Sequence, residues 1–193
     1  MRYISSFLIL SVFFSNVQAQ LSKRTWLLGG TANLSATRDS YSSTISTSAT
    51  DALNIRVLPG IGYFLADKFS VGFRLGYTKF KAEGVGPSGL STNVNRLDFG
   101  PFTRYYFLNT DKPFNVLADV GYQYGSYWFR PSRGSRHTFS ASTGMVTFFN
   151  SSVALEMLVG YYIQSERIRD PERTVIEQRG LQMSIGFQFH LEK

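Results

Sequence analysis

The stretch Leu181-Gln182-Met183-Ser184-Ile185-Gly186-Phe187-Gln188-Phe189-His190-Leu191 decides the fold, because every second residue in it is apolar. Successive side chains of a β-strand point to opposite faces, so odd-numbered residues share one face and even-numbered residues the other. The odd face carries leucine, methionine, isoleucine and phenylalanine, while the even face carries glutamine, serine, glycine and histidine. The stretch therefore predicts a strand with one apolar and one polar face.

The same alternation recurs through the chain in runs of about ten residues, which is the length of a tilted strand that crosses a bilayer. An even number of such runs is typical of single-chain bacterial membrane barrels. We expect eight strands, near residues 24–35, 54–65, 69–80, 93–107, 114–127, 138–149, 153–163 and 181–191.

The connections between these runs alternate in length. Residues 66–68, 109–113 and 150–152 form short connections, whereas residues 36–53, 81–92, 128–137 and 164–180 form longer ones. Short periplasmic turns and long external loops produce this asymmetry. The pattern predicts an all-β fold: an eight-stranded antiparallel up-and-down transmembrane β-barrel with short periplasmic turns and longer extracellular loops. The Ser/Thr-rich residues 40–48 should be solvated and mobile.

The N-terminus has the order of a secretory signal: Arg2, an apolar run over residues 7–14, and a polar stretch that ends in Val17-Gln18-Ala19. We expect a signal peptide over 1–19 and the barrel domain over 20–193. The alternative is a buried N-terminal helix. Beyond residue 20 there is no apolar stretch of about 18 residues, so strands would have to span any membrane.

The composition excludes a disordered chain. The 193 residues carry a formal charge of +7, and 43% are hydrophobic and 16% aromatic. The chain has no cysteine, so disulfides cannot stabilise it after export. A closed, hydrogen-bonded barrel in lipid would supply the stability instead.

The alternation also predicts which charged residues point into the barrel. An eight-stranded barrel is filled by its own side chains, and buried charges must be paired. We expect Arg74 near Asp119 and Arg104 near Glu156, with a filled core and little or no conduction; the alternative is a gated ion path. The predicted interior charge network is Arg56, Arg74, Asp98, Arg104, Asp119 and Glu156.

The two histidines, His137 and His190, belong to no Ser/His/Asp triad or metal-ligand spacing. A histidine needs positioned partners before it acts as a base or a ligand. The sequence therefore predicts a protein that is not an enzyme, with no catalytic residue, metal ligand or cofactor.

Aromatic and basic residues gather near the expected strand ends. Tyr63, Tyr105, Phe107, Phe114 and Phe149 are expected on one rim, and Tyr77, Tyr124, Trp128 and Tyr161 on the other. Arg130, Arg133 and Arg136 follow the second rim, where they would meet lipopolysaccharide phosphates or simply form a solvated rim. The mixed charges of residues 164–180 and the export signal argue against nucleic acid.

The pattern Ser184-x-Gly186-x-x-Phe189-x-Leu191 resembles the final-strand signal of small outer-membrane β-barrels, the OmpA/OmpX-type and porin-like families of Gram-negative bacteria. The resemblance covers the chain after the signal, although two residues follow Leu191 where the commonest form ends. It implies the outer membrane as location, and barrel-assembly machinery and outer-membrane lipid as partners, alongside any unidentified extracellular partner.

Four functions are compatible with this pattern. The first is a structural, envelope-stabilising or surface-interaction barrel. The second is a narrow channel or transporter of small, even hydrophobic, solutes. The third is a lipid-modifying outer-membrane enzyme. The fourth is a soluble ligand-binding barrel of the lipocalin kind, which would turn the apolar faces inward.

Overall fold

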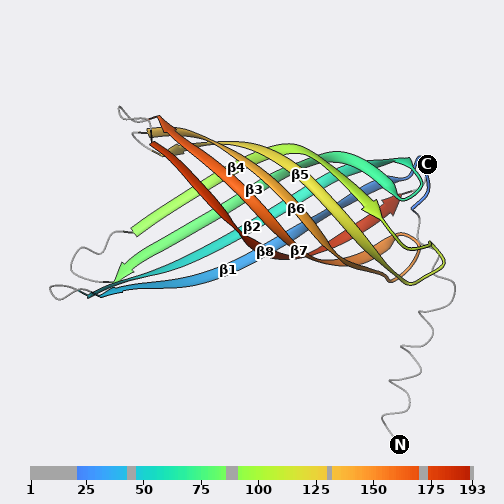
Figure 1. Ribbon diagram of the computed structural model, residues 1–193, viewed down its shortest axis with the longest axis horizontal. Helices are drawn as coiled ribbons and strands as arrows, with labels where there is room; N and C mark the ends of the chain where they lie inside the picture. The colour runs from blue at the N-terminus through green and yellow to red at the C-terminus, as the bar shows by residue number, and fades with distance from the viewer. Residues whose placement is uncertain (1–20, 43–46, 86–90, 130–131, 170–173, 192–193) are drawn as a thin grey trace, which may run out of the picture.

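The computed structural model describes residues 21–42, 47–85, 91–129, 132–169 and 174–191. Within them, eight antiparallel strands follow one another round a closed barrel (Figure 1). This confirms the predicted fold class, whereas the signal segment 1–19 lies outside the described residues. The strands are β1 (Trp26–Ser42), β2 (Thr47–Ala66), β3 (Phe69–Val85), β4 (Ser91–Tyr106), β5 (Phe114–Phe129), β6 (Ser132–Phe148), β7 (Val153–Arg169) and β8 (Thr174–Leu191).

The strand ends differ from the predicted ones by at most two residues on the short-turn side and by up to seven on the opposite side. On the short-turn side, β3, β5 and β7 begin where the sequence predicts. On the opposite side the strands continue through most of the residues predicted as long loops, so that β8 begins at Thr174 instead of 181. Backbone hydrogen bonds extend these hairpins where the alternation of side chains has faded. Of the predicted mobile segment 40–48, residues 43–46 lie outside the described residues.

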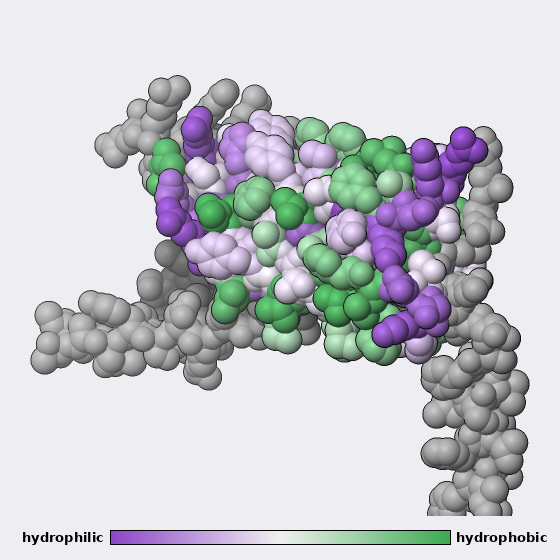
Figure 2. Space-filling view, turned by 45° about the vertical axis from the view of Figure 1, so that its right-hand side comes forward, coloured by the Kyte–Doolittle hydropathy of each residue, from purple (hydrophilic) through white to green (hydrophobic). Residues whose placement is uncertain are grey.

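The two faces of the strands are inverted relative to a soluble protein. Phe73 on β3 is 61% exposed on the outer surface, whereas Arg104 on β4 is 4% exposed inside the barrel. Hydrophobic side chains gather over the middle of the face in Figure 2, with hydrophilic ones toward both ends. The arrangement is the reverse of the one that a lipocalin-like barrel requires. No helix among the described residues is long and apolar enough to cross a membrane.

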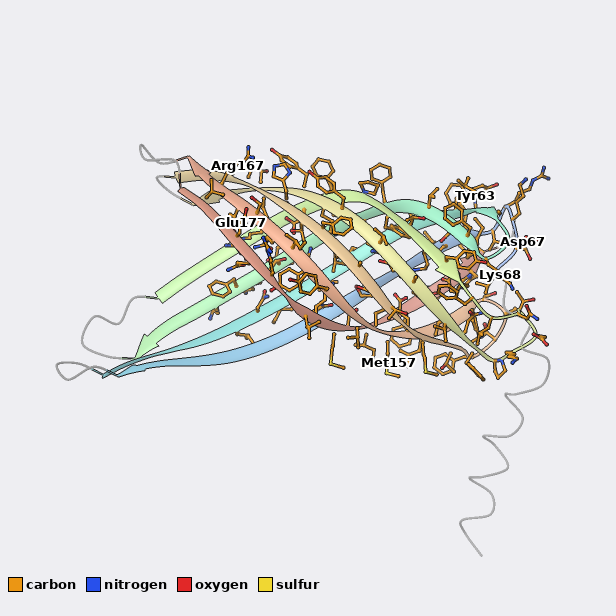
Figure 3. The ribbon with its side chains drawn as sticks, viewed as in Figure 1. Tyr63, Asp67, Lys68, Met157, Arg167 and Glu177 are labelled. Carbon is orange, nitrogen blue, oxygen red and sulfur yellow. The ribbon has the colours of Figure 1, made fainter. Side chains whose placement is uncertain are left out.

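The residues before β1 close the short-turn end of the barrel. The backbone N–H of Lys68 donates to Leu21 at 2.8 Å, and the N–H of Arg24 donates to Phe64 at 2.9 Å. The N–H of Lys23 donates to the Asp67 carboxylate at 2.8 Å. Asp67 and Lys68 mark this end in Figure 3. The segment is therefore tied to the β2–β3 turn.

Two prolines interrupt the ladders without changing their register. Pairing between β2 and β3 skips from Val57↔Tyr77 to Gly60↔Arg74, around Pro59. Pairing between β4 and β5 skips from Phe99↔Tyr124 to Phe102↔Gly121, around Pro101. Proline has no N–H to donate, so each ladder loses a bond at that point.

Two of the eight strand junctions are shorter than the rest. β1 and β8 pair only from Trp26↔Leu191 to Ala32↔Ile185. β4 and β5 pair only from Tyr106↔Leu117 to Leu97↔Ser126. Beyond these points the barrel divides into a first half (β1–β4) and a second half (β5–β8). Their far ends separate at the left of Figure 1.

Candidate functional site

An apolar floor fills the barrel at its short-turn end. Phe64, Tyr106 and Phe148 are buried there together with Leu21. The ring of His190 lies 5.5 Å from the Phe148 ring and 5.8 Å from the Phe64 ring, measured between centroids. Such packing fills this end of the lumen with side chains.

A lower tier of charges lies on the floor. Arg104 reaches two carboxylates: its Nε donates to Asp119 at 3.0 Å, and its Nη1 lies 2.9 Å from Glu156. The Gln188 amide donates to Glu156 at 2.5 Å and accepts from the Tyr106 hydroxyl at 2.8 Å. Each of these buried charges therefore has an opposite charge and further hydrogen bonds, as burial requires.

Arg74 completes the lower tier. Its guanidinium donates through both Nη atoms to Asp119, one of them at 2.8 Å, which is the fork geometry that arginine offers to a carboxylate. It also stacks 4.0 Å from the centre of the Phe102 ring. A Cβ added at Gly62 would lie 3.0 Å from the same ring. The small residues of β2 and β3 therefore make room for Phe102.

A middle tier joins Asp98, Arg56 and Arg136. Arg136 donates through Nε at 3.2 Å and through Nη2 to the two oxygens of Asp98. Arg56 hydrogen-bonds Gln123 and lies 3.8 Å from Asp98. Any Cβ at Gly125 would run into the Asp98 carboxylate, so glycine is required at this close approach. An upper tier above it contains the ion pair of Arg96 and Glu166 at 3.5 Å.

Interior charges are distributed unequally between the two halves. Among the described interior residues, the first half supplies most of the cations and the second half most of the anions, and only Asp98 and Arg136 reverse this order. Every described interior ion pair except Arg56–Asp98 joins one half to the other. These pairs are Arg74–Asp119, Arg104–Asp119, Arg104–Glu156, Arg136–Asp98 and Arg96–Glu166.

The described side chains of the lumen leave small cavities between them, of which two lie beside interior arginines. The upper cavity, about 30 Å³, lies beside Arg56, and the lower cavity, about 20 Å³, lies beside Arg104. Thr31, Leu58 and Arg74 line both cavities and so separate them. A water needs roughly 10–15 Å³ of such space, so each cavity has room for about one or two waters.

The structure places all six charges of the predicted network inside the barrel. It also brings together the two pairs that the sequence suggested, Arg74 with Asp119 and Arg104 with Glu156. Three further interior charges were missed: Arg96, Arg136 and Glu166. Arg96 shares its parity with Asp98 on β4, and Glu166 shares its parity with Glu156 on β7. The alternation within the predicted strand 93–107 would have found Arg96, and its continuation beyond residue 163 would have found Glu166.

The prediction that Arg136 contacts lipopolysaccharide is wrong. Its side chain is 5% exposed and points at Asp98, because β6 begins six residues earlier than predicted and even-numbered residues of β6 face inward. Arg130 lies outside the described residues. Arg133 is in β6, but its side chain is not described, so both remain predictions.

Neither histidine lies in a catalytic arrangement with its described partners. Nδ1 of His137 is 2.6 Å from the Tyr122 hydroxyl near the outer surface. Nε2 of His190 is 3.1 Å from the Gln188 side-chain oxygen in the floor. No group of three or more acidic or histidine side chains within the described ranges could hold a metal ion.

The residues of the suggested assembly signal lie on both faces of β8. Ser184 and Gly186 face the lumen, while Phe189 and Leu191 face outward, both 45% exposed. The described aromatic residues of the two predicted rims lie on the outer surface, and the side chain of Trp128 is not described. Figure 3 shows Tyr63 near one end of the barrel, Arg167 and Glu177 near the other, and Met157 on the outer surface between them.

The comparisons with known proteins concern the fold. No protein-family model and no curated protein matches the sequence. Among solved structures, the chain is similar to the outer membrane protein OprG from Pseudomonas aeruginosa, with a TM-score of 0.63 and 14% identity over 92% of this chain and 100% of that chain. It also matches Neisserial surface protein A (NspA), with a TM-score of 0.49 and 19% identity over 86% and 96% of the two chains. The likeness to OprG, together with the closed eight-stranded barrel, shows that the fold is that of an outer-membrane β-barrel.

Proposed function

We propose that the protein is an integral outer-membrane barrel with a side-chain-filled lumen and a structural, envelope-stabilising or surface-interaction role. One observation carries the proposal: the apolar side chains face outward around a closed barrel whose interior holds paired charges. Leu75, Phe99 and Met157, for example, are each more than half exposed. In water such a surface would drive aggregation, whereas in lipid it is the stable arrangement.

The strand lengths support a projection beyond the membrane. A tilted strand of roughly 9–11 residues crosses a bilayer, and β2 has 20 residues. The surplus lies on the side opposite the short turns, where Lys79, Arg167 and Glu177 are exposed. The hairpins would therefore extend outward from the cell and offer a surface to an extracellular partner.

The filled lumen supports a closed barrel. Among the described residues, the apolar floor, three tiers of ion pairs and cavities with room for about one or two waters favour a lumen without a continuous aqueous path. The ion pairs also join the first half to the second half, where the backbone pairing is short. The interior charges therefore stabilise closure of the barrel, which a structural role requires.

The partners of this proposal follow from its chemistry. Lys79 and Lys81 lie two residues apart on the outer face of β3, next to Asn95 on β4, above the exposed Tyr77. Two ammonium groups above an aromatic belt suit the phosphates of lipopolysaccharide. Export through a cleaved signal peptide, and recognition of β8 by barrel-assembly machinery, belong to the same proposal.

Two measurements test the proposal. The purified protein, refolded in detergent micelles, should migrate differently on a denaturing gel before and after boiling, and it should aggregate when detergent is removed. In planar bilayers it should insert without discrete conductance steps, because the floor and the tiers block the lumen. A monomer that stays soluble without detergent would refute the membrane placement, and regular conductance steps would refute the closed lumen.

A second function, a path for small hydrophobic solutes, is favoured by one observation. An apolar groove of about 480 Å³ lies on the outer face where Pro101 interrupts the β4–β5 ladder. Its walls include Phe73, Val120 and Phe139. Proteoliposomes should then take up a small apolar dye faster than empty vesicles, and Val120→Trp, which fills the groove, should abolish the difference. Equal uptake by both would exclude this function.

A further inference from the structure

The charges of the lower and middle tiers do not balance. Among the described residues these tiers hold four arginines and three carboxylates, which leaves one positive charge in excess (4 − 3 = +1). A charge buried in a barrel is costly unless an opposite charge lies close to it. The seven residues are Arg56, Arg74, Arg104 and Arg136, with Asp98, Asp119 and Glu156.

Arg56 carries this excess charge. Asp98 lies 3.8 Å from it, and that carboxylate already accepts both hydrogen bonds of Arg136. The hydrogen-bond partner of Arg56 is Gln123, which is neutral. Its Nε is buried and has no hydrogen-bond partner. The guanidinium therefore shares its one carboxylate with Arg136 and retains an Nε–H donor that the described residues leave unsatisfied.

The upper cavity adjoins this guanidinium. Its space of about 30 Å³ has room for about two water-sized spheres. Arg74 also lines it, and the one carboxylate in its wall, Asp119, is bound by Arg74 and Arg104. The remaining polar wall consists of hydroxyl and amide groups, which can donate hydrogen bonds. They belong to Thr31, Asn33, Gln123, Ser140, Ser142, Gln182 and Ser184.

We propose that the upper cavity binds one small monovalent anion of the chloride class, as the counter-ion of Arg56. The excess charge supplies the attraction, the free Nε–H and the surrounding hydroxyls supply donors, and the small volume excludes organic anions such as gluconate. A water beside the anion would donate to Oδ1 of Asn33, which is buried without a partner. The anion balances the charge of the described lower and middle tiers.

Substitutions in the middle tier test the proposal, because some of them remove the excess positive charge and one of them increases it. Arg56→Gln removes the excess charge, and Arg136→Gln does so indirectly, because it frees Asp98 to pair with Arg56. Asp98→Asn raises the excess to two charges. The matched control is Arg179→Gln, because the Arg179 side chain is 62% exposed.

The first measurement is the apparent thermal midpoint of the refolded protein in chloride and in gluconate at equal ionic strength. Chloride should raise the midpoint of the native chain and of the control by about 5 °C. The shift should vanish in Arg56→Gln and Arg136→Gln and grow in Asp98→Asn. The same shift in all four variants would overturn the proposal. If Arg56→Gln does not fold, Arg136→Gln carries the same test, because its side chain does not line the cavity.

The second measurement locates the ion. Crystals of the protein grown with bromide should show an anomalous peak in the upper cavity beside Arg56, and the peak should be absent from crystals of Arg136→Gln. Water alone in that cavity, with bromide only on the surface, would overturn the proposal.

Discussion

The first and second halves of the barrel are alike in fold and opposite in interior charge. Each is a four-stranded antiparallel sheet with long internal ladders. The described interior of the first half carries four arginines and one aspartate, and that of the second half carries three acids and one arginine. The difference indicates two kinds of interaction in the barrel. Backbone pairing holds the strands of each half together, and ion pairs across the lumen join one half to the other.

Removal of the Asp119 carboxylate should cause the largest loss of stability, because it weakens the ion pairs that join the two halves. Asp119 lies on the second half and accepts from both Arg74 and Arg104 of the first half. Asp119→Asn leaves two buried guanidinium groups short of a carboxylate, and it should lower the free energy of unfolding by about 3–5 kcal/mol. Urea unfolding of the refolded protein, followed by tryptophan fluorescence, measures the loss.

The matched control for Asp119→Asn is Glu177→Gln. Glu177 pairs with Arg179 at 3.4 Å, but both side chains are 62% exposed, so solvent screens the pair. Its removal should change the unfolding free energy by less than about 0.5 kcal/mol. Equal losses of unfolding free energy in Asp119→Asn and Glu177→Gln would mean that the interior ion pairs do not hold the two halves together.

A steric change between the halves should have an intermediate effect. In Gly125→Ala, the new methyl group would press on the Asp98 carboxylate of the first half and lie 2.9 Å from the carbonyl oxygen of Leu97. We expect a loss of about 1–3 kcal/mol in urea unfolding. In Gly180→Ala, the methyl group would meet the Tyr162 ring of the same half at 3.1–3.3 Å, so the loss should stay below about 1 kcal/mol. A larger loss for Gly180→Ala would contradict the comparison.

The smallest effect is expected where a missing hydrogen bond is restored. Pro101→Val supplies an N–H at the junction of the two halves, and Pro59→Val supplies one within the first half. The gained bond is offset by a more flexible unfolded chain, so both should change the unfolding free energy by less than about 1 kcal/mol. Hydrogen exchange separates them: only Pro101→Val should slow exchange along β4 and β5. Slower hydrogen exchange along β4 and β5 in Pro59→Val would show that the β4–β5 junction is not independent of the rest of the first half.

The parity of each strand allowed most of the interior to be predicted. Once Glu156 was placed inside, every second residue of β7 had to follow it, because side chains alternate strictly along a strand. Arg136 was misplaced because β6 was predicted to begin at residue 138, beyond the arginine. The same alternation, continued by one step from Thr138, places Arg136 in the lumen.

The strand ends opposite the short turns could not be predicted in the same way. Residues 164–180 mix acidic and basic side chains on both faces, so they carry no period-two signal. The described part of this stretch, residues 164–169 and 174–180, forms strands through backbone hydrogen bonds between β7 and β8, such as those of the Gln164↔Gln178 region, and backbone groups are the same in every residue. Only the register of the β7–β8 hairpin in the folded structure shows where these strands end.

By itself, the sequence determined that eight strands alternate in polarity, that their apolar faces share one side and that their charges share the other, because side-chain direction has a period of two residues. The tertiary structure alone decided that Arg104 also reaches Asp119 and that Arg136 pairs with Asp98, since these contacts depend on the stagger of different strands. It also decided that backbone pairing ends early at two junctions. Closure of a barrel fixes stagger and curvature for all strands together, and no single strand encodes either of them.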